Sequence, residues 1–294
     1  MTSAASQSPT SFVALLTDFG DRDGYVGVVK GVILRLCPNC TIVDLAHHID
    51  PQDVNHAGWV LNQCFDALPD QTVIIAVVDP YVGDATQRSV VLVFEAGQKV
   101  VVVPDNGLAG RLLARNEPVE VRVIENPALQ GAGQSTTFHG RDRYAPVGAH
   151  LARAIAEGTL PAMLAAVGPS LPAADLKRQG QAMAPVLRED DRLIQGAIDA
   201  LDRYGNLLTN VPNTMWPGTW TEADVATAQI NDRTIPVVCC LSYSALQKPN
   251  EGPAPIGLIR GSHGCLELAV DGASLSETLG IRADELPTPF ELRL

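Results

Sequence analysis

Short continuous apolar runs, separated by polar turns, recur along the first half of the chain. Runs of this length are typical of strands that are buried on both faces of a parallel sheet. They predict strands at 12–16, 41–45, 72–78, 89–94 and 99–103. Apolar residues at helical spacing predict helices at 26–36, 51–65 and 146–157.

The alternation of strand and helix predicts an α/β fold, with a doubly wound, mainly parallel sheet in an N-terminal domain of residues 1–180. From residue 190 to residue 294, strand-like runs alternate with turn residues and helical patterns are scarce. This pattern predicts a C-terminal β-barrel-like domain. The Pro-rich stretch 168–190 has little periodicity, so we place the domain boundary there.

The composition and net charge of the chain argue against nucleic acid and membranes as partners. The chain has 294 residues, 46% of them hydrophobic, and a formal net charge of −12. A negative chain repels nucleic acid and anionic membranes on average, and no apolar run approaches the roughly 20 residues that span a bilayer. The first ten residues lack the basic start of a secretory signal, so we expect a cytoplasmic protein.

Acidic residues follow three of the predicted strands. Asp18, Asp79 and Asp105 each come directly after an apolar run or one or two residues later. Because ligands of open α/β sheets bind outside the carboxyl ends of the strands, these acids are candidate site residues. No Gly-rich phosphate loop follows the first strand, and the acidic turn there suits a hydroxylated or cationic ligand better. Asp21 is expected to cap the helix that follows.

A second candidate is the segment 136–142, which places His139, Arg141 and Asp142 together just before a predicted helix. A single histidine is more often structural than catalytic, but the side chain titrates near neutral pH and here has charged neighbours. The other five histidines lack such neighbours, and we expect structural roles for them.

Five motifs in order along the chain resemble the S-adenosyl-L-methionine hydroxide adenosyltransferase family, relatives of the fluorinases and chlorinases. The resemblance spans about residues 13–280. The motifs are Leu16-Thr17-Asp18-Phe19-Gly20, Asp79-Pro80-Tyr81-Val82-Gly83, Pro104-Asp105-Asn106-Gly107-Leu108, Thr137-Phe138-His139-Gly140-Arg141-Asp142 and Asp202-Arg203-Tyr204-Gly205-Asn206.

The resemblance implies hydrolysis of S-adenosyl-L-methionine to adenosine and L-methionine, with no metal and no cofactor. It implies catalytic residues in the N-terminal domain and a contribution of the C-terminal domain to the substrate site. The implied catalytic residues are Asp79, Arg88 and His139. The implied substrate-binding residues are Asp18, Asp23, Tyr25, Asp202, Asn206, Tyr243 and Ser262. The family also implies a homotrimer whose active sites lie between subunits.

Two departures from the family pattern leave alternatives open. Tyr81 stands where glycine is usual, and the segment before Arg88 is one residue longer than usual. These features would also suit a protein that binds S-adenosylmethionine or adenosine without turnover. A halide-using relative is a second alternative. An Asp–Arg ion pair that only joins two strand ends is the structural alternative for Arg88. A further alternative for the function is metal-dependent hydrolysis at the acidic strand ends.

Overall fold

The computed structural model describes residues 11–95, 98–131, 135–178, 184–188, 192–216, 221, 224–246 and 254–293. The first ten residues, where no secretory signal is expected, lie outside these ranges, as do 179–183 and 189–191 of the expected boundary. The chain divides into two compact units, residues 1–180 and 181–294. No helix in the described ranges is long and apolar enough to cross a membrane.

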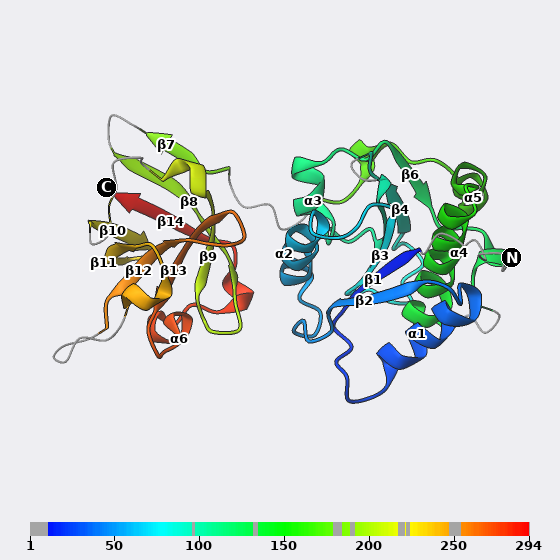
Figure 1. Cartoon of the computed structure of the whole chain (residues 1–294), viewed down its shortest axis with the longest axis horizontal. Coiled ribbons are helices and arrows are strands. Elements are labelled where there is room, and N and C mark those ends of the chain that lie inside the picture. Colours follow the sequence, from blue (N-terminus) through cyan, green and yellow to red (C-terminus); the bar gives the residue numbers. More distant parts are fainter. Residues whose placement is uncertain are drawn as a thin grey trace, which may run out of the picture. The chain divides into compact units, whose positions relative to one another are not determined.

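The first unit is built on a sheet of six strands in the order β2-β1-β3-β5-β4-β6 (Figure 1). Four neighbouring strands are parallel, whereas β4 runs antiparallel to both β5 and β6. The strands are β1 (Phe12–Thr17), β2 (Thr41–Ala46), β3 (Thr72–Val77), β4 (Ser89–Val93), β5 (Val100–Pro104) and β6 (Glu120–Val123). Every residue of β3, β4 and β5 is buried, which explains their continuous apolar sequences.

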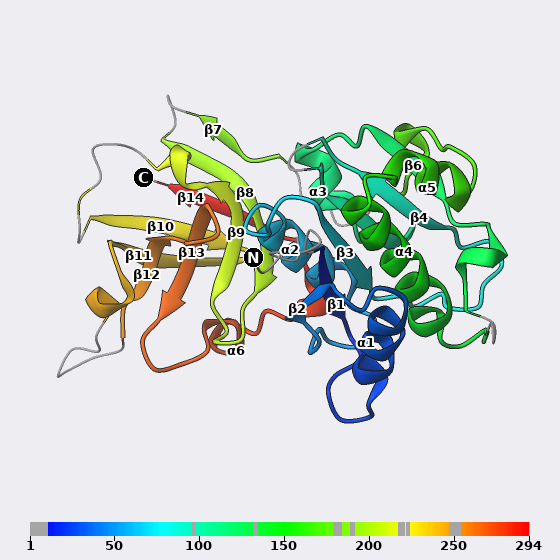
Figure 2. The same cartoon turned by 45° about the vertical axis from the view of Figure 1, so that its right-hand side comes forward.

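Helices cover both faces of this sheet, so the predicted doubly wound α/β fold is confirmed (Figures 1 and 2). One face carries α1 (Tyr25–Leu36), α4 (Ala145–Ala156) and α5 (Leu160–Val167), which share one hydrophobic cluster with the sheet. The other carries α2 (Val54–Phe65) and α3 (Gly110–Arg115), which share a second cluster. The predicted helix 51–65 begins only at Val54, because the side chain of Asp53 caps it by accepting from the amide of His56.

The second unit is a closed β-barrel, as the C-terminal pattern predicts. Seven strands close into a ring through the β14–β8 pairing, and β7 extends the sheet beside β8. The strands are β7 (Val186–Arg188), β8 (Leu193–Leu201), β9 (Leu207–Pro212), β10 (Val225–Ile230), β11 (Arg233–Cys240), β12 (Ile256–Arg260), β13 (Cys265–Val270) and β14 (Thr288–Arg293). The short helix α6 (Leu275–Leu279) packs against β13.

The structure contains several elements that the sequence pattern did not predict. They are α3, α5, α6, β6, β7, β10 and β14. In β10 the side chains buried in the barrel include only alanines and one isoleucine, at 226, 228 and 230. A strand whose inward positions are small gives a weak hydrophobic signal, although its ladder to β11 is continuous.

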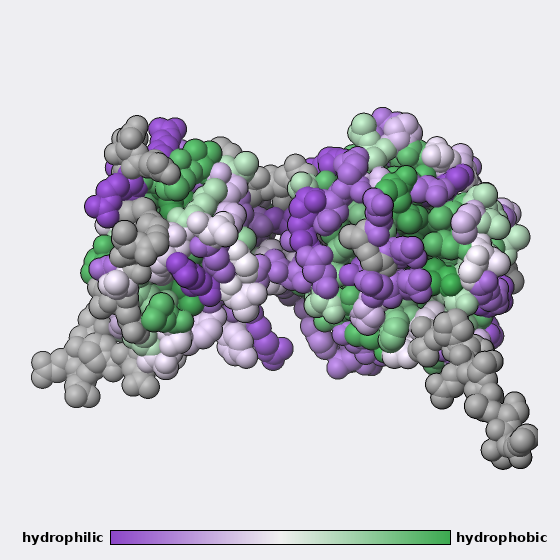
Figure 3. Space-filling view, turned by 45° about the horizontal axis from the view of Figure 1, so that its top comes forward, coloured by the Kyte–Doolittle hydropathy of each residue, from purple (hydrophilic) through white to green (hydrophobic). Residues whose placement is uncertain are grey.

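The described surface is mixed in character. On the face in Figure 3, hydrophilic residues cover much of the first unit, with smaller hydrophobic areas between them.

We expect Gly148→Ala to destabilise the first unit. A Cβ at Gly148 would lie 2.4 Å from Cδ1 and 2.7 Å from Cγ1 of the buried Ile75, so α4 packs on β3 through a position that has no room for a methyl group. Overpacking of this kind costs about 1–3 kcal/mol in the free energy of unfolding. Urea denaturation measures the change.

The matched control is Gly31→Ala in α1, where a Cβ meets no atom within 4 Å. This variant should be stabilised by about 0.5–1 kcal/mol, because alanine has the higher helix propensity. Equal stability of the two variants would contradict the packing argument.

Candidate active site

The carboxyl ends of β1 and β3 lie side by side. The two strands are parallel, with Thr17 opposite Val77, so Asp18 and Asp79 leave the sheet at the same edge. Oδ2 of Asp18 accepts from the amide of Gln52 at 2.9 Å. His47 anchors the same turn, since its Nδ1 lies 2.8 Å from Thr17 Oγ1. This contact is of the structural kind expected for His47.

Asp79 is half-buried and weakly hydrogen-bonded. Its Oδ1 accepts from the amide of Tyr81 at 3.2 Å, and its Oδ2 accepts from the hydroxyl of Tyr144 at 3.4 Å. Burial raises the pKa of the carboxyl above its usual value, against the opposing effect of these hydrogen bonds and of the charges on His139 and Arg143. A carboxylate with a raised pKa and long hydrogen bonds is suited to accept a proton.

His139 is held by a cluster of aromatic rings. Phe138 packs edge-on against Phe19 and Tyr25, with ring centroids 5.7 and 5.1 Å apart. Gly140 allows this approach, since a Cβ there would lie 3.0 Å from the Phe19 ring. The segment that carries His139 is thereby fixed against the turn that follows β1.

The loop after β3 meets the same segment from the other side. Gly83 has a φ of 92°, and a Cβ there would lie 2.6 Å from the carbonyl oxygen of Thr136. The loop carrying Asp79 and the segment carrying His139 are therefore in backbone contact, and the side chains of Asp79 and His139 interact electrostatically.

The pKa of His139 is lowered. Burial is the largest cause and the charge of Arg143 adds to it, whereas the carboxylates of Asp79 and Asp142 act in the opposite direction. The imidazole is therefore mostly neutral at neutral pH and can accept or donate a hydrogen bond.

Arg88 lies against a different carboxylate. Its Nε and Nη2 lie 2.9 and 2.6 Å from Oδ2 of Asp105, whose side chain is 2% exposed, and its Nη2 donates to the carbonyl of Asp175 at 2.7 Å. Among the described residues, no hydrogen bond or ion pair joins Arg88 to Asp79. The structure thus brings Asp79 and His139 together and places Arg88 at the end of β5.

Asp105 is fully engaged in this arrangement, since its Oδ1 also accepts from the amide of Lys177 at 2.8 Å. In the part of the chain that the structure describes, no group of three or more His, Cys, Asp or Glu side chains could hold a metal ion. The three acids at the strand ends therefore do not gather into such a group.

Arg143 is the arginine that interacts with both Asp79 and His139, and no sequence motif points to it. Its Nη1 donates to Ser89 Oγ at 3.1 Å, and Ser89 Oγ donates to the Tyr144 hydroxyl at 3.0 Å. The available signal was its position four residues after His139, a spacing that places two helical side chains on one face.

The predicted substrate residues of the first unit lie on the turn after β1. Tyr25 is the first residue of α1 and is half exposed beside Phe138, whereas Asp23 is exposed in the turn itself. Asp21 does not cap α1: the cap residue is Gly24, with a φ of 78°, and Asp21 instead lies 3.5 Å from His48. Gly24 reaches this left-handed conformation without strain. Because glycine has no side chain, it forms no side-chain cap.

In the second unit, Asp202 and Asn206 form one turn between β8 and β9. Oδ1 of Asp202 accepts from the amides of Tyr204 and Asn206, and its Oδ2 accepts from Nδ2 of Asn206 at 2.8 Å. Asn206 is buried. Ser262 is exposed in the turn between β12 and β13.

Tyr243 reaches the same end of the barrel, where its hydroxyl donates to the buried carboxyl of Glu267. Burial and the charge of Asp202 raise the pKa of Glu267, and the charge of Asp202 also contributes to the raised pKa of Tyr243. Two predicted residues of this unit, Asp202 and Tyr243, therefore interact with Glu267. No motif marks Glu267 in the sequence, because it lies within an ordinary strand pattern.

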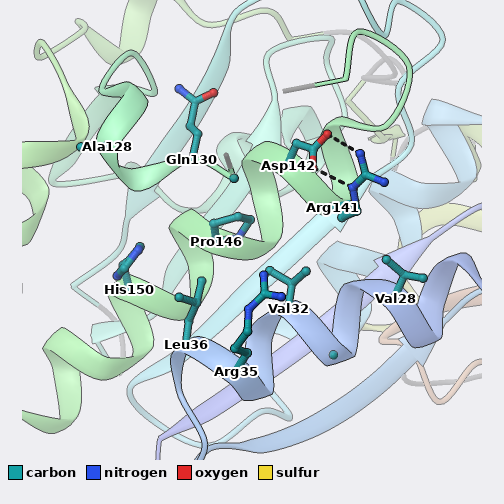
Figure 4. Close-up of a pocket in the computed structure, with 12 residues that line it drawn as sticks. Val28, Val32, Arg35, Leu36, Ala128, Gln130, Arg141, Asp142, Pro146 and His150 are labelled. Carbon is teal, nitrogen blue, oxygen red and sulfur yellow. Dashed lines mark hydrogen bonds and ion pairs between the residues drawn. The ribbon is translucent and has the colours of Figure 1, made fainter. Parts of the chain in front are cut away.

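A cavity of about 960 Å³ lies between α1, α4 and the segment around residue 130 (Figure 4). Its lining includes Arg35, His150 and the Arg141–Asp142 ion pair, in which the guanidinium donates two hydrogen bonds of 2.7 Å. None of the predicted catalytic or substrate-binding residues lines it. The predicted site and this cavity are therefore separate features of the first unit.

The fold and the site define a two-unit protein in which a carboxylate and a neutral histidine meet at the carboxyl edge of a parallel sheet. Models of the S-adenosylmethionine hydroxide adenosyltransferase N-terminal and C-terminal domains match residues 13–160 and 196–286. The chain belongs to this family.

The chain is 34% identical over 277 residues to a protein named (R)-S-adenosyl-L-methionine hydrolase from Thermus thermophilus, covering 92% of this chain and 96% of that one. It is 26% identical to a fluorinase from Nocardia brasiliensis, covering 96% and 97% of the two chains. The crystal structure of an uncharacterized conserved protein from Thermotoga maritima matches with a TM-score of 0.81 at 28% identity, covering 96% and 100%.

We expect Asp79→Asn to raise stability at neutral pH. The pKa of Asp79 is higher in the folded than in the unfolded chain, so the carboxyl loses its proton more readily on unfolding, and the wild-type protein loses stability as pH rises through these values. Asparagine stays neutral, so its advantage should be full near pH 7 and vanish near pH 3. Thermal unfolding at the two pH values measures it.

Asp84→Asn in the same loop is the control, because the pKa of Asp84 is shifted in the opposite direction. Hydrogen bonds from Thr86 lower the pKa of Asp84. This variant should not gain stability at neutral pH. A gain for Asp79→Asn that persists at pH 3 would contradict the assignment of a raised pKa.

Proposed function

We propose that the protein hydrolyses S-adenosyl-L-methionine to adenosine and L-methionine. The name of the Thermus thermophilus relative specifies the (R) epimer of S-adenosyl-L-methionine, and we propose the same epimer as the preferred substrate here. The observation that carries the proposal is the pair of Asp79 and His139, at the sheet edge of a chain whose two units both match the family. The relative from Thermus thermophilus, aligned over 92% of this chain, supports the same activity.

In the proposed reaction, water attacks C5′ of the ribose opposite the sulfonium sulfur. The new C5′–O bond forms as the C5′–S bond breaks, and methionine leaves with the electron pair of that bond. The sulfonium is already a good leaving group, so the protein has to align the water and remove its proton. Asp79 accepts this proton, and neutral His139 orients the water by a hydrogen bond.

The predicted substrate residues take complementary roles in this proposal. Asp18 accepts hydrogen bonds from the ribose hydroxyls, and Tyr25 lies along the methionine chain. Asp23 and Asp202 face the methionine amine, and Ser262 faces its carboxylate. Asn206 meets the adenine edge, and Tyr243 stacks on the ring.

We further propose a cytoplasmic homotrimer in which the N-terminal unit of one subunit and the C-terminal unit of another complete each site. This part of the proposal rests on the membership of both units in the family. Sedimentation equilibrium should give about three times the chain mass of 31.2 kDa. A monomer would overturn this part of the proposal.

The test of the activity is chromatography of purified protein incubated with each S-adenosylmethionine epimer. Adenosine and methionine should form in equal amounts, and ¹⁸O from labelled water should appear on C5′ of adenosine. Calorimetric binding with no product over hours would instead favour a binding protein, an alternative suggested by the exposed Tyr81 beside Asp79.

We expect Asp79→Ala to lower kcat about a hundredfold or more, the range expected for the loss of a proton acceptor, while substrate still binds. Initial rates and calorimetry measure the two effects. Asp84→Ala in the same loop is the control, since Asp84 is exposed and bonded within its own turn. Near-normal hydrolysis by Asp79→Ala would contradict the assignment of the proton acceptor.

We expect no 5′-halo-adenosine from chloride or fluoride. A halide about 4 Å from the Asp79 carboxylate is repelled by roughly 4 kcal/mol at an effective dielectric constant near 20, about a thousandfold in occupancy. Water instead donates a proton to the same carboxylate. Mass spectrometry of reactions in molar halide tests this, and accumulation of 5′-chloro-5′-deoxyadenosine would contradict it.

A further inference from the structure

We propose that Arg143 is the arginine that supplies positive charge to Asp79 and His139. It is a positioning residue that acts on Asp79 through Ser89 and Tyr144. Arg88 then has the structural task of joining strand ends. The inference rests on the proposed hydrolysis for its kinetic consequences, but the arrangement of charges can be tested without turnover.

The direction of the hydrogen-bond chain is the first argument. Arg143 can only donate, and its Nη1 donates to Ser89 Oγ at 3.1 Å. Ser89 therefore turns its own proton to the Tyr144 hydroxyl at 3.0 Å, and Tyr144 turns its proton to Asp79 Oδ2 at 3.4 Å. Each link polarises the next, so the positive end of the chain is Arg143 and the negative end is Asp79.

The charge of Arg143 is not neutralised by an ion pair. Within the described ranges no carboxylate lies within ion-pairing distance of its guanidinium, and its buried Nε has no hydrogen-bond partner there. Leaving such a donor unsatisfied costs free energy, which the fold must recover elsewhere. The charge of Arg143 therefore acts on the half-buried carboxylate of Asp79 and on His139, and lowers the pKa of both.

Arg88 cannot supply this charge. Its Nε and Nη2 are committed to Asp105, and Nη2 also donates to the carbonyl of Asp175. The carboxylate of Asp105 offsets the charge of Arg88. The ion pair joins the start of β4, the end of β5 and the segment around Asp175, which is a structural connection.

The other charged and titratable groups around the pair can be accounted for. Asp79 faces His139, Arg143 and the hydroxyl of Tyr144, and His139 faces Asp79, Arg143 and Asp142. Asp142 is paired with Arg141 by two hydrogen bonds of 2.7 Å, so its charge is largely offset. Removing Arg143 should therefore raise the pKa of both Asp79 and His139, because the positive charge favours ionised Asp79 and disfavours protonated His139.

The first test is an NMR titration of ¹³Cε1-labelled histidine in the full chain, with the His139 signal assigned by His139→Gln. The pKa of His139 should rise clearly in Arg143→Met and stay near the wild-type value in Arg143→Lys and in Arg88→Met. An unchanged pKa in Arg143→Met, or an equal rise in Arg88→Met, would overturn the proposal. This readout needs no substrate, so it remains decisive even if the wild-type protein fails to hydrolyse S-adenosylmethionine.

The second test is kinetic and separates positioning from substrate binding. Arg143→Met should lower kcat about tenfold or more with KM changed less than threefold, and should move the acid limb of the kcat profile to higher pH. Arg143→Lys should restore most of the pH profile. Arg88→Met should lower the thermal unfolding temperature and leave the acid limb in place, and a shifted limb in that variant would overturn the proposal.

Ser89→Ala covers the case in which Arg143→Met does not fold. It removes the middle of the chain and keeps the charge, so kcat should fall several-fold while the pKa of His139 stays near the wild-type value. A kcat equal to that of the wild type would show that the hydrogen-bond chain does not act on Asp79.

Discussion

The partial burial of the Asp79 carboxylate is the constraint on which the rest of the site depends. Its two hydrogen bonds, of 3.2 and 3.4 Å, are too long to compensate fully for the water that burial removes. The carboxylate is therefore less stable as an anion than an exposed one and binds a proton more readily. The neighbouring positive charges of His139 and Arg143 act in the opposite direction and limit the rise of this pKa.

Glycines set the distances at which the elements around Asp79 meet. Gly83 brings the loop after β3 against Thr136, and Gly140 brings the His139 segment against Phe19. Gly148 then seats α4 directly on Ile75 of β3, the strand that leads to Asp79. A side chain at any of these positions would clash with the element packed against it. A misplacement of about 1 Å in an active site is enough to lower its rate strongly.

The sequence predicted the sheet edge well, because buried parallel strands have continuous apolar runs and their ends are marked by Asp18 and Asp79. It could not identify the partner of Arg88 from the motif alone. The antiparallel pairing of β4 with β5 sets Ser89 opposite Pro104, which brings Arg88 and Asp105 together. Glu267 was missed for a related reason: the pairing of β13 with β9 sets it opposite Leu208, and so near the turn that holds Asp202. Its hydrogen bond with Tyr243 also joins segments far apart in the sequence, and no local pattern marks either contact.

The wide turn that carries Arg143 follows from a single proline. In an α-helix the carbonyl of Asp142 would accept from the amide of residue 146, but Pro146 has no such amide and its ring crowds that carbonyl. The carbonyl of Asp142 instead accepts from Gly131 at 2.7 Å, and the backbone widens to a π-helical turn, Gly140–Tyr144, in which the amide of Ala145 donates to Gly140. The turn leads directly into α4, which is seated on β3 through Gly148. The two residues that act on Asp79, His139 and Arg143, are thereby tied to the strand that supplies the carboxylate.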